Sequence, residues 1–82
     1  MTAKEMFEAL GYEEAVGYTG LMYKKITIER DEIFGKYLKI KYIHFYEEKV
    51  SVDVSTCFGG KGIADMEELK AINQQCKELG WF

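Results

Sequence analysis

The stretch of residues 36–46 constrains the fold most, because it is apolar or aromatic on both faces when it is placed in a strand. Successive side chains of a strand point to opposite sides. The two predicted rows are Leu38, Ile40, Tyr42, His44 and Tyr46 on one face, and Tyr37, Lys39, Lys41, Ile43 and Phe45 on the other. A chain of 82 residues has little material to cover both rows. We therefore expect one row on the core, and the other at solvent, a second copy or a partner.

Two capping boxes predict a helix near each end of the chain. Thr2 with Glu5 begins a predicted helix over residues 2–10, which is too short to be stable in water unless it docks. Asp65 with Glu68 begins a second helix that ends at Gly80. Helical spacing predicts a buried apolar stripe on this second helix: Met66, Leu69, Ile72, Cys76 and Leu79.

Three strands are predicted between the helices, over residues 19–29, 36–46 and 50–56. Residues 12–17 read as a connection, 30–35 and 47–49 as turns, and 57–64 as a glycine-rich loop. The predicted fold is a single α+β domain over residues 1–82 with the order α-β-β-β-α. Its three strands form an antiparallel meander, and both helices lie on one face of that meander, giving two layers.

The third predicted strand decides which face the helices cover. Val50, Val52 and Val54 alternate with polar residues, so the valine face is expected in one core with Leu69 and Ile72. Two lysines in a small core would need partners. We therefore assign the lysine-containing row of residues 36–46 to the uncovered face.

This uncovered row, extended by two residues of the preceding strand, is the predicted interaction surface: Tyr23, Lys25, Tyr37, Lys39, Lys41, Ile43 and Phe45. An aromatic and aliphatic patch fringed with lysine suits a protein interface, either in a homodimer or with a host or phage protein. Lysines beside flat rings also suit single-stranded nucleic acid, which is the alternative function. In a third alternative, Trp81 and Phe82 fold across the row and cover it internally.

No motif in the chain predicts an enzyme, a metal site or a cofactor. The glycine-rich loop has Lys61 but lacks the Gly-Lys-Ser/Thr ending that holds a phosphate. His44 is the single histidine, and a nucleophilic pair with Cys57 would need the fold to bring the two together. Cys57 and Cys76 fit no zinc-binding spacing. We expect a non-enzymatic protein.

Composition points to the cytoplasm. The formal net charge is -3 and the isoelectric point is about 5.1, which argues against a dedicated duplex-DNA binder. Residues 1–10 contain three charges and no apolar run of the kind that marks a secretory signal, and no segment is long enough to span a membrane. Both cysteines are therefore expected as free thiols.

Both predicted helices end in short leucine–glycine motifs, Leu10-Gly11-Tyr12 and Leu79-Gly80-Trp81, and residues 68–75 have the pattern Glu-Leu-x-Ala-Ile-x-x-Gln. In these motifs the chain resembles small uncharacterised proteins of Gram-positive bacteria and their prophages. The resemblance covers the two helices, less than half of the chain, and matches the middle only as a β-rich insert. It implies an α+β fold and a phage or prophage context. It implies no known activity, so no functional residue is carried over.

Overall fold

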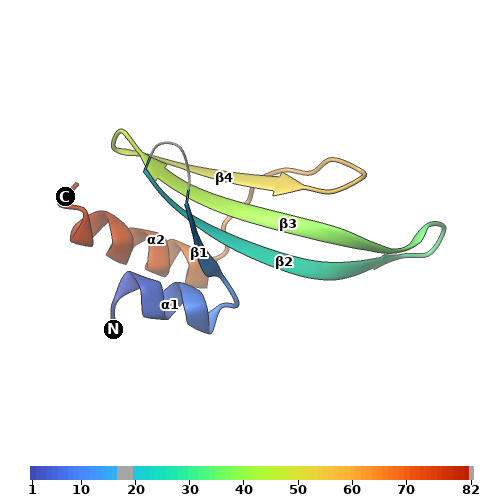
Figure 1. Cartoon of the computed structure of the whole chain (residues 1–82), viewed down its shortest axis with the longest axis horizontal. Coiled ribbons are helices and arrows are strands. Elements are labelled where there is room, and N and C mark those ends of the chain that lie inside the picture. The colour runs from blue at the N-terminus through green and yellow to red at the C-terminus, as the bar shows by residue number, and fades with distance from the viewer. Residues whose placement is uncertain (17–19, 82) are drawn as a thin grey trace.

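The computed structural model describes residues 1–16 and 20–81 and shows an α+β fold with four strands rather than three (Figure 1). The four strands form one antiparallel sheet in the order β1-β2-β3-β4. The elements in chain order are α1 (Ala3–Ala9), β1 (Glu13–Val16), β2 (Leu21–Asp31), β3 (Gly35–Tyr46), β4 (Lys49–Ser55) and α2 (Met66–Glu78). Both predicted capping boxes are present, at Thr2 with Glu5 and at Asp65 with Glu68.

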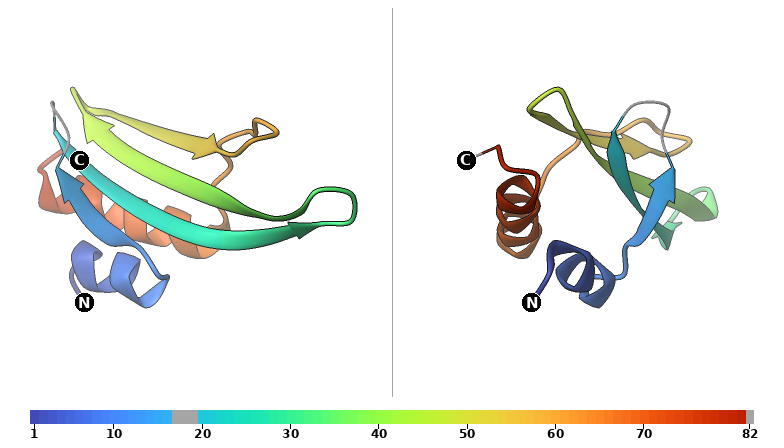
Figure 2. Two further views of the ribbon diagram at one scale, coloured as in Figure 1. Left: turned by 45° about the vertical axis from the view of Figure 1, so that its right-hand side comes forward. Right: turned by 60° about the vertical axis from the view of Figure 1, so that its left-hand side comes forward.

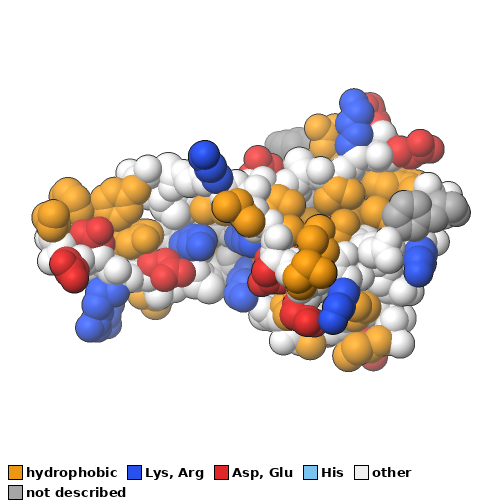
Figure 3. All heavy atoms as spheres, turned by 180° about the vertical axis from the view of Figure 1, so that it is seen from behind, with side chains coloured by type: hydrophobic (Ala, Val, Ile, Leu, Met, Phe, Trp, Pro, Cys, Tyr) orange, Lys and Arg blue, Asp and Glu red, His pale blue; other side chains and the backbone are white. Residues whose placement is uncertain are grey.

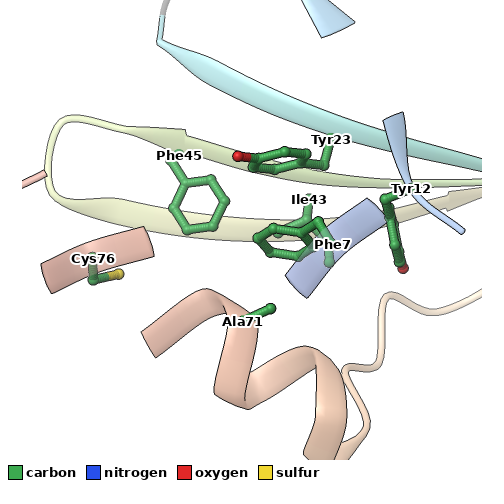
Figure 4. Close-up of a cluster of buried hydrophobic side chains, with 7 residues drawn as sticks. All are labelled: Phe7, Tyr12, Tyr23, Ile43, Phe45, Ala71 and Cys76. Carbon is green, nitrogen blue, oxygen red and sulfur yellow. The ribbon is translucent and has the colours of Figure 1, made fainter. Parts of the chain in front are cut away.

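The two helices lie side by side on one face of the sheet, which confirms the predicted two-layer arrangement (Figure 2). The core lies between these layers and is mainly aromatic (Figure 4). The Phe7 ring of α1 stacks on Tyr23 of β2 with ring centroids 4.1 Å apart, and it meets Phe45 of β3 edge-on. Hereafter the inner face of the sheet is the one under the helices, and the outer face is the opposite one.

Strand β1 is a correction to the predicted connection over residues 12–17. Its sequence, Glu13 to Val16, starts with two charged residues and has no alternation that would identify a strand. It forms because its backbone pairs with the first part of β2, where Glu13 lies opposite Lys24 and Val16 opposite Leu21. Residues 17–19, which include the predicted start of the next strand, lie outside the described residues.

The assignment of β3 to the inner and outer faces is a second correction. The prediction rested on the cost of burying two lysines, whereas the turn between β3 and β4 sets the observed faces. Glu47 and Glu48 both have positive φ, at 48° and 60°, so the turn contains only these two residues and Tyr46 pairs with Lys49. The predicted turn contained three residues. Because side chains alternate, a one-residue shift exchanges the two faces of a strand.

The structural register places Ile43 opposite Val52 and Phe45 opposite Val50. The valine face is the inner face, as predicted, and Val52 packs against the core, but Val50, which was predicted in that core, is 36 % exposed. The row that shares this face is the lysine-containing one, which was wrongly predicted to be uncovered. The outer face instead carries the row that includes Tyr42 and His44.

Helix α2 is a third correction, because it turns part of its apolar stripe away from the core. Its buried residues are Glu68, Ala71, Gln75 and Cys76. Of the predicted stripe, Ile72 packs against the core, whereas Met66 is 68 % exposed and Leu69 45 % exposed. The polar side chains turn inward because the inner face presents hydroxyl and ammonium groups that need partners.

Candidate interaction surface

The predicted interaction surface is largely buried. Tyr23, Ile43 and Phe45 are among the most buried residues of the described chain, under Phe7 of α1. Trp81 also packs against Phe45, with ring centroids 6.3 Å apart, so the predicted alternative of internal cover by Trp81 is present at this one residue of the row. Phe82, the other residue of that alternative, lies outside the described residues. The prediction that Ile43 and Phe45 contact a second copy in a homodimer is therefore wrong, because both residues are in the core.

Lys41 of the same row has a partner inside the fold. Its ammonium group lies 2.7 Å from Glu68 of α2 and donates a second hydrogen bond to the Ile63 carbonyl. The Tyr12 hydroxyl donates to the other carboxylate oxygen of Glu68, Oε2. The Asp65 N–H donates to Oε1, the oxygen that Lys41 contacts, at 2.9 Å. A lysine under the helices is tolerated because this carboxylate compensates its charge.

The network shifts the ionisation of its members in opposite directions. Burial raises the pKa of Glu68, but hydrogen bonds from Lys41, Tyr12 and the Asp65 backbone more than offset it and hold the pKa below its ordinary value. Burial, with the Glu68 carboxylate beside it, raises the pKa of Tyr12. The Tyr23 hydroxyl donates to Gln75 at 2.8 Å, and burial raises the pKa of Tyr23 to about 12. Within the described residues no buried side-chain nitrogen or oxygen lacks a hydrogen-bond partner.

The remaining residues of the predicted row also make contacts within the fold. The Lys25 ammonium lies 5.6 Å from the centre of the Tyr12 ring. Tyr37 meets Phe58 edge-on, with ring centroids 4.9 Å apart. Lys39 lines a small hollow of about 200 Å³ together with Lys61 and the adjoining glycines. The row is therefore not an exposed platform on which bases could stack.

The glycine-rich loop packs on β4. A Cβ at Gly62 would lie 1.5 Å from the Val52 carbonyl oxygen, and one at Gly60 would lie 3.0 Å from a Val54 methyl. These two glycines are needed because the loop backbone comes so close to the strand.

His44 and Cys57 are not brought together. His44 lies on the outer face, stacked on Tyr46 with ring centroids 4.7 Å apart and paired with Ser51 near the start of β4. Cys57 is exposed in the loop beyond the other end of that strand, and Cys76 is buried; both are free thiols. Over residues 1–16 and 20–81 no three His, Cys, Asp or Glu side chains are grouped as metal ligands. None of the helices described there has the length and apolar character needed to cross a bilayer.

The surface that sequence reasoning missed is on the outer face. Residues 26–40, here called the projecting hairpin, extend beyond both helices (Figure 1). Four aliphatic side chains form two cross-strand pairs on its outer face, Ile26 with Ile40 and Ile28 with Leu38. We call them the aliphatic quartet. Ile28 is 70 % exposed, Leu38 58 % and Ile26 52 %, while Ile40 is half-buried. Predicting a two-residue turn at Glu47-Glu48 from the sequence would have identified this outer face.

A second apolar surface lies on α2. Met66, Leu69, Ile72 and Cys76 line a shallow groove of about 410 Å³ with Lys70 and Asn73. Seen from behind, hydrophobic side chains gather at both the narrow end formed by the hairpin and the broad helical end, with lysine or arginine side chains between them (Figure 3). The quartet differs from the groove because it is built on two hydrogen-bonded strands with directly opposed side chains.

No family model, curated protein or solved structure matches this chain. The resemblance of its two ends to prophage proteins therefore stays a prediction. The outer face of the projecting hairpin is the candidate interaction surface.

Proposed function

We propose that the chain is a non-enzymatic protein-interaction module that binds another protein through the outer face of its projecting hairpin. The observation that carries the proposal is the aliphatic quartet, three members of which are more than half exposed on a part of the sheet that no helix covers. Isolated exposed hydrophobic residues are ordinary, but a contiguous group bordered by polar residues is typical of binding sites.

The residues around the quartet indicate the chemistry of the partner. Arg30 and Lys36 lie opposite each other on the outer face, next to the Ile28–Leu38 pair. On the other side of the quartet, Lys24 lies 3.7 Å from Glu13. Protein interfaces combine an apolar centre with a polar rim. The partner that fits is a protein with an apolar patch bordered by carboxylates near Arg30 and Lys36. We place this interaction in the cytoplasm, in a phage or prophage context, with a host or phage protein.

A matched pair of substitutions tests the proposal. Leu38→Glu puts a charge in the quartet, whereas Ile63→Glu makes a comparable change on an exposed loop residue. The wild-type protein and both variants would be expressed in cells as baits, each with a photo-crosslinking amino acid at position 40. A crosslinked partner would then be purified and titrated.

We expect a defined partner to bind the wild type and the Ile63 variant and to lose about tenfold or more in affinity for the Leu38 variant, since about 1.4 kcal/mol corresponds to a tenfold change. The affinity should change little with salt. A partner that binds Leu38→Glu as tightly as wild type would contradict the proposal. So would affinity that falls steeply with salt, because that dependence is typical of nucleic-acid binding. Ile43→Asp is unsuitable as a test, since Ile43 is in the core.

A further inference from the structure

The two long edges of the sheet are treated differently by the rest of the fold. At the β4 edge, the glycine-rich loop returns so closely that Gly62 lies against the Val52 carbonyl. At the other edge, β1 pairs with β2 only as far as Lys24. Among residues 1–16 and 20–81, no strand pairs with the outward side of β2 beyond that point. Natural sheets usually protect such an edge, because its unpaired backbone groups can accept another strand.

The backbone groups that point outward along this edge follow from the turn between β3 and β4. In a two-residue turn the residues on either side, here Tyr46 and Lys49, share a hydrogen bond. Backbone groups alternate in direction along an antiparallel strand. The register of β2 with β3 then directs the N–H and C=O groups of Ile26, Ile28 and Arg30 away from β3.

The sequence of this edge complements itself when it is reversed. In an antiparallel pair of two β2 edges centred on Ile28, that residue lies opposite Ile28 of the second copy. Ile26 lies opposite Arg30 of the second copy, and Lys25 lies opposite its Asp31. Opposed β-branched residues and opposed charges both stabilise an antiparallel pair. Residues 26–30 contain no proline, so one of the usual protections is absent, and their two charged residues, Glu29 and Arg30, follow Ile28.

We propose that two copies of the chain pair antiparallel through residues 26–30 of β2, with Ile28 on the two-fold axis. The product is one continuous sheet of eight strands with the helices of both copies on the same face. The two aliphatic quartets then lie next to each other on the outer face and form one larger apolar surface. This inference stands on the edge of β2 and does not rest on the proposed function, which concerns the outer face.

Charge variants at the axis provide the first test. Ile28→Lys places two like charges opposite each other across the axis, and Ile28→Glu does the same with the opposite sign. Sedimentation equilibrium should show a micromolar dimer for wild type and a dissociation constant about tenfold higher for each variant alone, because opposed like charges disfavour pairing. An equimolar mixture of the two variants should dimerise again as a heterodimer. Leu38→Lys is the control, because it makes the same change on β3 and should leave the dimer intact.

Disulfide crosslinking provides the second test, in a Cys57→Ser background that removes the exposed thiol. Hydrogen-bonded antiparallel pairs have Cα atoms about 5.5 Å apart, within the range of a disulfide. Ile28→Cys should therefore form a covalent dimer on mild oxidation. Leu38→Cys should form no such crosslink. The two β3 strands would lie about 14 Å apart, because both β2 strands lie between them.

Three results would overturn the inference: wild type monomeric throughout the micromolar range, a dimer that Ile28→Lys leaves unchanged, or Leu38→Cys crosslinking as fast as Ile28→Cys, which would indicate face-to-face packing. Circular dichroism of each variant would establish that it is folded. Leu38 separates the two proposals, since its charge variant should lose the protein partner and keep the dimer.

Discussion

The two halves of the long β2–β3 ladder differ in burial, although both are formed by the same two strands. Near the helices, Tyr23, Ile43 and Phe45 are almost completely buried. In the projecting hairpin, Ile28 and Leu38 are more than half exposed, although the strands there are just as regular. Aromatic and aliphatic side chains in the first half hold the layers together, whereas the aliphatic side chains in the second half contribute little to the core. Hydrophobicity in a strand of this chain therefore does not by itself indicate burial.

The largest expected effect is the difference between what the two halves contribute to the free energy of unfolding. Phe7→Ala should lower the free energy of unfolding by about 3–5 kcal/mol, because it removes the ring that touches Tyr23 and Phe45 and leaves a cavity. Leu38→Ala should change it by less than about 0.5 kcal/mol. Urea unfolding followed by circular dichroism measures both. A domain this small has only a few kcal/mol of stability, so Ile43→Val, with an expected loss of about 1 kcal/mol, serves if the first variant is unfolded. Equal losses at Phe7 and Leu38 would show that the hairpin is part of the core.

The second prediction concerns the polar part of the buried half. Glu68→Ala should cost about 2–3 kcal/mol, because it leaves the Lys41 ammonium and the Tyr12 hydroxyl without their partner. Glu67→Ala is the matched control on the same helical turn. Its 3.2 Å ion pair with Lys70 is at the surface, so we expect a change below about 0.5 kcal/mol. Similar costs for the two substitutions would mean that the buried network contributes nothing beyond helix capping.

The third prediction tests whether the glycine-rich loop protects the β4 edge of the sheet. Gly62→Ala should destabilise the fold by about 1–3 kcal/mol, because a Cβ there overlaps the Val52 carbonyl and must push the loop away. Lys61→Ala, at the neighbouring exposed position, should be neutral within about 0.5 kcal/mol. Amide hydrogen exchange should show faster exchange along β4 in the Gly62 variant only. Unchanged exchange along β4 would indicate that the loop does not protect that edge.

The smallest expected effect is the pH dependence of stability from the buried network. The pKa of Glu68 is lower in the folded chain than its ordinary value of 4.5. Its contribution to stability is therefore present above that value and is lost as the pH falls through the lowered folded pKa. The pKa values of Tyr12 and Tyr23 are raised above 10.0, so their contribution is present below pH 10.0 and is lost as the pH rises above it. Thermal unfolding from pH 2 upward should show a shallower acid limb for Glu68→Gln than for wild type. Parallel acid limbs would remove Glu68 as the group responsible.

Local signals in the sequence determined the helices and most of the sheet. The capping boxes at Thr2 and Asp65 predicted where both helices begin, because a capping side chain acts on backbone groups only three residues away. The valine alternation of β4 identified its inner face correctly, because alternation along a strand is also a local signal. The long strands and the α+β class followed from these elements.

Only the tertiary structure decided which residues are available to a partner. The two-residue turn before β4 places the row with Ile43 and Phe45 under the helices and the row with Leu38 outside, against the expectation that the lysine-containing row is uncovered. The partner of Lys41 is 27 residues away on α2, and no local pattern relates the two. Strand β1 exists only because β2 lies beside it. Spacing along the chain specifies local structure, whereas exposure depends on pairings between distant segments, and one residue of register reverses it.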